Sequence, residues 1–246
     1  MNNKDFYNSL SLNYDLMINF EKSLKNKTES LRNFVEKQYN NALDIGCGTG
    51  VDSIALSELG LKVDAVDQSN EMLKLAKLNA QKRELNINFF QSKTDAIPLT
   101  KRYDLIISLG NTIANISNEE LEILFKKLPI ILNKNGKIII QILNFSSLPK
   151  SGYYLLNKYE NDNIQIIRKY LIKGNNIDFI IEINSAERKE TIVTKIFPYS
   201  LGDFEKLTQK NDLTFNKFGN LRKDIYSPIN SKNLIIEIQK KNSFNH

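Results

Sequence analysis

Several residue types that mark particular protein classes are scarce in this sequence. The chain of 246 residues has one cysteine, so an internal disulfide is excluded, as is typical of proteins from a reducing compartment. No apolar run approaches the roughly 20 residues that span a bilayer. The first residues also lack the basic-then-apolar pattern of a signal peptide. We therefore expect a cytoplasmic protein without a membrane segment.

Residues with strong catalytic chemistry are equally sparse. The single histidine, His246, is the last residue, which we interpret as a frayed tail. Cys47 has no histidine or second cysteine near it in the sequence, so we expect neither a nucleophile nor a metal site. The net charge is +6 and the pI is near 9.1, but the basic residues form no dense stripe. Charge therefore gives nucleic-acid binding little support.

The most informative stretch that is present is ALDIGCGTG, residues 42–50. Four largely apolar residues predict a buried strand, and three alternate glycines precede a helical pattern that begins at Val51. A strand, a glycine loop and a helix N-terminus together predict a nucleotide-type pocket, because glycine lets the backbone approach a ligand closely. The dinucleotide fingerprint would need a glycine at position 51. The spacing therefore favours a nucleoside with a small charged tail, and a nicotinamide-dependent dehydrogenase is the weakest hypothesis.

A second predicted strand, residues 61–67, ends in an acidic residue. At the tip of this strand, the Asp67 carboxylate is placed to accept hydrogen bonds from both ribose hydroxyls of an adenosine ligand. The structural alternative is that Asp67 caps the helix that begins near Asn70. Both interpretations stay open on the sequence alone.

Two further polar segments follow in order. A third predicted strand, 87–91, leads to Thr94-Asp95-Ala96, and a fourth strand that begins at Tyr103 opens into the loop 109–115. With the glycine loop and Asp67, these segments resemble the cofactor motifs of class I S-adenosylmethionine-dependent methyltransferases, over residues 40 to 145. The resemblance implies S-adenosylmethionine as cofactor and S-adenosylhomocysteine as product.

The resemblance also implies a set of cofactor-binding residues. Asp44 would hold the methionine ammonium, and Asp95 would accept from the adenine amino group. Met72 would pack on the face of the adenosine. The structural alternatives are that Asp44 is a loop acid that caps backbone amides, that Asp95 is a turn residue and that Met72 is a core methionine. The full set is Asp44, Gly46, Cys47, Gly48, Thr49, Gly50, Asp67, Gln68, Met72, Thr94, Asp95, Ala96, Leu109 and Gly110.

The sequence Gly-Asn-Thr-Ile-Ala at 110–114 is similar to the glycine and sarcosine N-methyltransferase branch of that family. In that branch Asn111 would reach the methyl acceptor, and Tyr14 and Tyr226 would line an amine pocket. These three residues are the catalytic candidates. The branch carries an arginine that grips a substrate carboxylate where this chain has Leu143. The arginines that could replace it are Arg168, Arg188 and Arg222, and the sequence selects none of them.

The alternation of strands and helices predicts an α/β fold with a parallel sheet and helices on both faces. The resemblance implies that this sheet is the Rossmann-like seven-stranded sheet of the family. Residues 1–40 form a helical lid, with Leu16 among the inward positions, and residues 41–148 form the cofactor-binding core. An antiparallel β cap at 149–199 is inserted after a fifth strand at 137–143, and is expected to cover the mouth of the active site. The remaining predicted segments are three cap strands at 164–172, 177–183 and 191–197, and residues 200–246, which complete the sheet.

The leading hypothesis is an S-adenosylmethionine-dependent methyltransferase that acts on a small-molecule nucleophile, preferably an amine nitrogen. The alternatives are an RNA or protein methyltransferase, and a non-catalytic S-adenosylmethionine-binding module. We expect a small-molecule partner, no nucleic acid, no membrane and no metal, and a homo-oligomer stays open. The identity of the acceptor, nitrogen or oxygen, and the number of methyl groups transferred also stay open.

Overall fold

The computed structural model describes residues 3–187 and 189–241. The helices are α1 (Asn3–Ile18), α2 (Phe20–Leu31), α3 (Val51–Glu58), α4 (Asn70–Gln81), α5 (Asn118–Ile131) and α6 (Leu201–Lys210). The core strands are β1 (Asn41–Ile45), β2 (Lys62–Asp67), β3 (Asn88–Gln91), β4 (Tyr103–Ser108), β5 (Leu132–Leu143), β10 (Leu213–Phe218) and β11 (Asn233–Lys240). The strands of the second sheet are β6 (Ser151–Glu160), β7 (Ile164–Lys173), β8 (Asn176–Ser185) and β9 (Lys189–Ile196).

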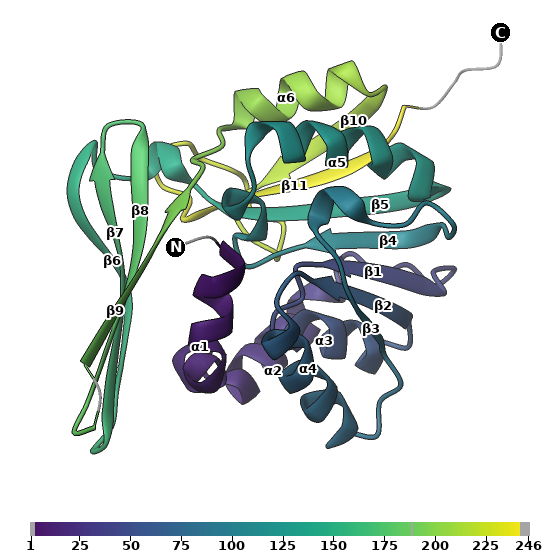
Figure 1. The fold of residues 1–246 in the computed structure, drawn as a ribbon. Coiled ribbons are helices and arrows are strands. Elements are labelled where there is room, and N and C mark those ends of the chain that lie inside the picture. Colours follow the sequence, from purple (N-terminus) through teal and green to yellow (C-terminus); the bar gives the residue numbers. More distant parts are fainter. Residues whose placement is uncertain (1–2, 188, 242–246) are drawn as a thin grey trace, which may run out of the picture.

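The larger sheet has seven strands in the order β10-β11-β5-β4-β1-β2-β3, which confirms the predicted fold class (Figure 1). Strands β1 to β5 pair in parallel, and β11 is antiparallel to both neighbours. Alternate residues face opposite sides, so Ala65 and Ile107 pack with α2, α3 and α4 while Val66 and Ile106 pack with α5 and α6. Strands β2 and β3 follow on one side of β1, and β4 and β5 follow on its other side. The boundary between β1 and β4 is therefore a switch point, and α/β sheets bind ligands at such points.

The N-terminal segment forms two helices where the sequence predicts one helical region. Asn19 has a positive φ of 50° and breaks the helix between α1 and α2. Leu16, predicted to face inward, is 45% exposed, whereas the adjacent Met17 is buried, so the inward face of α1 passes through Met17. Helix α1 lies between the core and the second sheet, and it contacts α4 on one side and β6 and β9 on the other (Figure 1).

The second sheet follows β5 as predicted, but it has four antiparallel strands in the order β6-β7-β8-β9. The sequence analysis missed β6, which is an edge strand with few buried side chains and a register shift between Leu155 and Asn157. These two features weaken the period-2 pattern on which strand prediction depends. Strand β5 also begins at Leu132 rather than at 137. Among the described residues, no helix is long and apolar enough to cross a membrane.

Candidate active site

A cavity of about 720 Å³ opens at the carboxyl ends of β1, β2 and β4. Its lining comes from the glycine loop, from the ends of β2 and β4, and from α1 and α2, which cover it. No residue of the β cap is among the described residues that line it, so the lid helices close this cavity. The predicted site residues that line it are Tyr14, Gly46, Cys47, Gly48, Thr49, Asp67, Gln68, Thr94, Leu109 and Gly110.

The Asp67 carboxylate organises the glycine loop. One oxygen accepts from the Gly48 backbone N–H at 2.9 Å, and the other accepts from the Ser69 N–H at 2.8 Å. The N-cap of α4 is Ser69, whose hydroxyl accepts from Met72 N–H, so the alternative of Asp67 as the helix cap is wrong. Burial raises the pKa of Asp67 while these N–H groups oppose the rise. Each carboxylate oxygen keeps a lone pair that can accept from a ligand.

Asp44 lies beneath the glycine loop rather than in the cavity. It is 1% exposed, and its carboxylate accepts from the Ser53 hydroxyl of α3. The carboxylate that lines the cavity at this end is Asp52, in the first turn of α3. The sequence analysis missed Asp52, although an acid in the first turn after a glycine loop is a recognisable signal.

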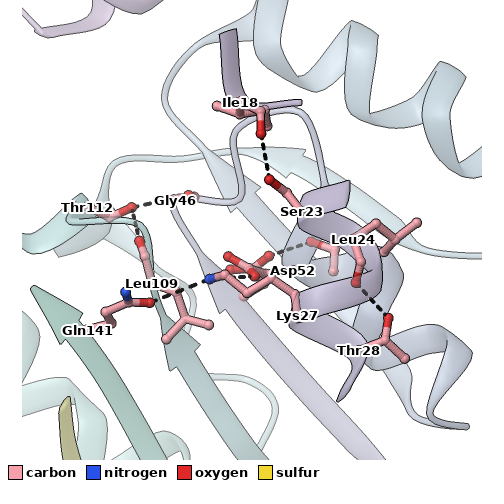
Figure 2. A network of polar contacts seen from close by, with 12 residues as sticks. Ile18, Ser23, Leu24, Lys27, Thr28, Gly46, Asp52, Leu109, Thr112 and Gln141 are labelled. Carbon is pink, nitrogen blue, oxygen red and sulfur yellow. Dashed lines mark hydrogen bonds and ion pairs between the residues drawn. The ribbon is translucent and has the colours of Figure 1, made fainter. Parts of the chain in front are cut away.

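A polar network fixes the lid helix α2 to this end of the cavity (Figure 2). The Lys27 ammonium lies 2.9 Å from an Asp52 oxygen and donates to the Gln141 side chain of β5 at 3.5 Å. Thr112 Oγ1 donates to the Leu109 carbonyl at 2.9 Å and lies 3.3 Å from the Gly46 carbonyl oxygen. The contacts of Lys27 therefore join α2 to α3 and β5 and place opposite charges at one end of the cavity, while those of Thr112 join the loop after β4 to the glycine loop. The sequence contains no motif that predicts a role for Lys27.

The other end of the cavity is lined by Ser92, Lys93 and Thr94. Asp95 does not line the cavity, but its Oδ1 is buried without a hydrogen-bond partner among the described residues. A buried carboxylate oxygen without a donor is costly unless a ligand supplies one. This atom is suited to an amino donor such as that of adenine. Ala96, predicted as a backbone contact, is exposed and outside the lining.

A second cavity of about 20 Å³ lies between the lid, the loop after β4 and the β cap. Tyr7, Tyr14, Gly110 and Asn115 line both cavities, so the two adjoin. Asn111 lines the smaller cavity, where its amide nitrogen donates to the Tyr170 hydroxyl at 3.1 Å and its oxygen accepts from Leu143 N–H at 2.9 Å. The β cap therefore closes this smaller cavity.

Three predicted site residues have structural surroundings instead. Tyr226 lines neither cavity, and its hydroxyl donates to Asn144 Oδ1 at 3.0 Å, which holds the loop before β11 against the end of β5. Met72 is fully buried in the hydrophobic cluster beneath the lid. Gly50 caps α3, where an added Cβ would lie 3.2 Å from the Ala76 Cβ of α4.

Replacing Asp44 by asparagine is expected to change how stability depends on pH. Burial, followed by the nearby Asp52 charge, raises the pKa of Asp44 to about 8. Between the ordinary aspartate range and pH 8, the native state therefore holds a proton that the unfolded chain has released, so stability falls as pH rises. The amide of the variant cannot titrate, and the stability of Asp44→Asn relative to wild type should increase from pH 5 to 8, by at most about 1.4 kcal/mol per pH unit.

Urea unfolding of both proteins at pH 5, 6.5 and 8 measures this difference. Asp64→Asn is the matched control, because burial raises the pKa of Asp64 but hydrogen bonds from Lys101 and Tyr103 lower it further than burial raises it. Asp64 is ionised in both states over this range, so the effect of Asp64→Asn should be constant. A pH-independent effect of Asp44→Asn would contradict the prediction.

Comparison with known proteins agrees with this geometry. A family described as "Methyltransferase domain" matches residues 42–136. A ubiquinone biosynthesis O-methyltransferase from Rickettsia typhi is 30% identical over 201 residues, which are 78% of this chain and 77% of that protein. Glycine N-methyltransferase from Rattus norvegicus is 26% identical over 200 residues, 70% of this chain and 68% of that protein.

Other similarities cover different lengths of the chain. Ribosomal protein L11 methyltransferase from Campylobacter fetus is 37% identical over 120 residues, but the chain spans only 40% of the length of that protein and 38% of a Campylobacter concisus relative of the same name. The structure of an S-adenosylmethionine-dependent methyltransferase from Clostridium acetobutylicum superposes with a TM-score of 0.77 at 19% identity, over 96% of this chain and 99% of that chain.

The glycine loop lies at the switch point of a seven-stranded sheet, and the similarity to the Rickettsia typhi enzyme covers 78% of the chain. Sheet order, cavity and sequence similarity thus agree. The chain belongs to the class I S-adenosylmethionine-dependent methyltransferases, and S-adenosylmethionine is its cofactor.

Proposed function

We propose that this enzyme methylates an amine nitrogen of a small molecule. The observation that carries the proposal is the lining of the smaller cavity, where tyrosine hydroxyls and the Asn111 loop meet the cofactor cavity. Burial raises the pKa of Tyr7 and of Tyr14, so both hydroxyls stay neutral. Neutral hydroxyls accept hydrogen bonds from N–H groups and leave the nitrogen lone pair free to attack. An alcohol, in contrast, has to lose its proton during the transfer.

The residues that line the larger cavity fit the cofactor. Lys27 and Asp52 offer opposite charges for the methionine carboxylate and ammonium, and Asp67 offers two carboxylate oxygens for the ribose. Outside the lining, next to Thr94, the buried Asp95 Oδ1 has no hydrogen-bond partner among the described residues. When bound, S-adenosylmethionine supplies a methyl group on a sulfonium that is already activated. The lid residues then have to exclude water and hold the acceptor in line with the methyl group.

The position of Asn111 supports a role at the acceptor. Its backbone has a positive φ of 73°, and both ends of its amide are fixed by hydrogen bonds to Leu143 and Tyr170. The side chain therefore ties the loop after β4 both to β5 and to the β cap. We infer that Asn111 orients the acceptor, together with Tyr14, where the two cavities meet.

The second candidate is methylation of a protein, which the similarity to ribosomal protein L11 methyltransferases favours. That similarity covers 46% of this chain, about the length of the cofactor-binding core. Substrate choice depends instead on the lid and the β cap, which enclose the smaller cavity in this structure. The space between them is only about 20 Å³, so an acceptor group that reaches into it from the larger cavity has to belong to a small molecule rather than to a folded protein domain.

A radiometric assay with methyl-labelled S-adenosylmethionine separates these candidates. We expect label in small primary or secondary amines, with S-adenosylhomocysteine formed in equal amount. The parallel reactions contain the corresponding alcohols, a ribosomal protein fraction or total RNA. Label confined to alcohols would contradict the amine proposal, and label in protein or RNA would favour the second candidate or an RNA substrate. S-adenosylhomocysteine binding without transfer to any of these acceptors would point to a non-catalytic module.

A further inference from the structure

The inner face of the β cap is largely apolar, and among the described residues it carries one cation, Arg168, near its middle and one acid, Glu190, on β9. Side chains at alternate positions of β7 and β8, such as Ile166, Phe179 and Ile181, pack in one hydrophobic cluster with the lid. Arg168 occupies the same face of β7, between the buried Ile166 and Tyr170 and opposite Ile181 in the register. A guanidinium at such a position loses much of its hydration.

Arg168 forms no ion pair with any of the residues that the structure describes. Its guanidinium carbon lies 5.5 Å from the centre of the Phe179 ring, and its Nε is buried without a hydrogen-bond partner among the described residues. Arg168 lines the smaller cavity together with Asn111, Tyr7 and Tyr14, and the described lining of that cavity includes no carboxylate. The positive charge also opposes the rise in the pKa of both lid tyrosines, which agrees with its closeness to them.

An unpaired charge of this kind lowers stability, because its desolvation is compensated by little more than a contact with an aromatic face. An arginine fork can bind both oxygens of a carboxylate at once, and the bonds are stronger where water is excluded. Arg168 faces the cavity that adjoins the cofactor site, so a ligand anion bound there would lie beside the acceptor position. The Arg168 guanidinium is therefore placed to bind an anionic group of the substrate.

We propose that Arg168 binds a carboxylate of the methyl acceptor, so that the substrate is a small amine that carries a carboxylate. The carboxylate would lie against the β cap, and the nitrogen would project between Tyr7 and Tyr14 toward the larger cavity. The amine part rests on the function proposed above, whereas the anion site stands on the contacts of Arg168. This selects Arg168 among three candidate arginines, since Arg222 is exposed and lines neither cavity, and Arg188 lies outside the described residues.

Matched substrate pairs test the proposal. Each small amino acid in the assay is paired with its primary amide, which has nearly the same size and no charge. For wild type we expect kcat/KM to be about 100-fold higher for the acid than for the amide, as is typical when one partner of a desolvated charge pair is removed. Arg168→Met should abolish this preference mainly through a higher KM, and Arg168→Lys should retain part of it. Arg222→Gln is the control and should leave the preference unchanged.

A second measurement does not depend on catalysis. Calorimetric titration of the S-adenosylhomocysteine-loaded protein with the same pairs should show binding of the acids to wild type and not to Arg168→Met. Without ligand, Arg168→Met should raise Tm by about 2–4 °C, because an unpaired, half-buried charge has been replaced by an apolar chain. Equal binding of acid and amide, or of acid to both proteins, would overturn the proposal. Acid binding that needs Arg168, without any transfer to nitrogen, would instead overturn the amine function and leave the anion site in place.

Discussion

Replacing Gly46 by alanine is expected to destabilise the protein by about 3 kcal/mol or more and to abolish cofactor binding. A Cβ at this position would lie 2.2 Å from Thr112 Cγ2 and 2.8 Å from its Oγ1, and the backbone has a φ of 76°. The left-handed backbone costs about 1–2 kcal/mol for a residue with a Cβ, and overpacking adds about 1–3 kcal/mol. The glycine loop would have to move away from the loop after β4, and both loops line the cofactor cavity.

Gly60→Ala is a close control for this variant. Gly60 has a φ of 92°, and nothing lies within 4 Å of an added Cβ, so this substitution carries the backbone cost without the clash. Urea unfolding should therefore show a loss of about 1–2 kcal/mol for Gly60→Ala, with S-adenosylhomocysteine binding unchanged. In a Gly46→Ala/Thr112→Ala double variant the nearest Thr112 atoms are removed, and part of the stability should return. Equal losses of stability for Gly46→Ala and Gly60→Ala would show that the contact with Thr112 has no effect.

Replacing Asp67 by alanine is expected to weaken S-adenosylhomocysteine binding by about 100-fold or more. Two hydrogen bonds from ribose hydroxyls to a charged oxygen contribute about 1.5–3 kcal/mol each, and 1.4 kcal/mol corresponds to a factor of ten. The variant also leaves the Gly48 and Ser69 N–H groups without their acceptor, which loosens the glycine loop. Calorimetric titration measures the affinity directly.

Asp67→Asn and Asp64→Asn complete this experiment. The amide of Asp67→Asn keeps one acceptor oxygen, so the affinity of this variant should fall between those of wild type and Asp67→Ala. Asp64 is on the same strand, but its partners are Lys101, Tyr103 and Asn88, outside both cavities. Asp64→Asn should therefore leave the affinity within about twofold of wild type while it lowers stability. Wild-type affinity in Asp67→Ala would exclude the carboxylate from the cofactor site.

The residues of the cofactor cavity could be predicted from short stretches of sequence. Gly46, Gly48 and Asp67 come at or directly after the ends of parallel strands, and the carboxyl ends of such strands meet at one edge of the sheet. Once alternation of strands and helices is recognised, the register brings these residues together without further information. The same logic predicted the parallel part of the sheet, because β1, β2 and β4 are buried on both faces and therefore read as nearly continuous apolar runs. The completion to seven strands was implied by the resemblance to the family.

Other features of the site depend on contacts between residues that are far apart in the sequence. Lys27 meets Gln141 across 114 positions, and Arg168 faces the lid from a strand whose pattern is shared by any half-buried strand. Asp44 and Tyr226 carry suitable side chains but are turned toward Ser53 and Asn144 by the packing of α3 and of the loop before β11. The sequence by itself determined the sheet and the position of the cofactor pocket, because both arise from local periodicity and strand ends. Tertiary packing alone decided that Lys27 and Arg168 reach the cavities, because the directions of these side chains depend on how the lid and the β cap dock.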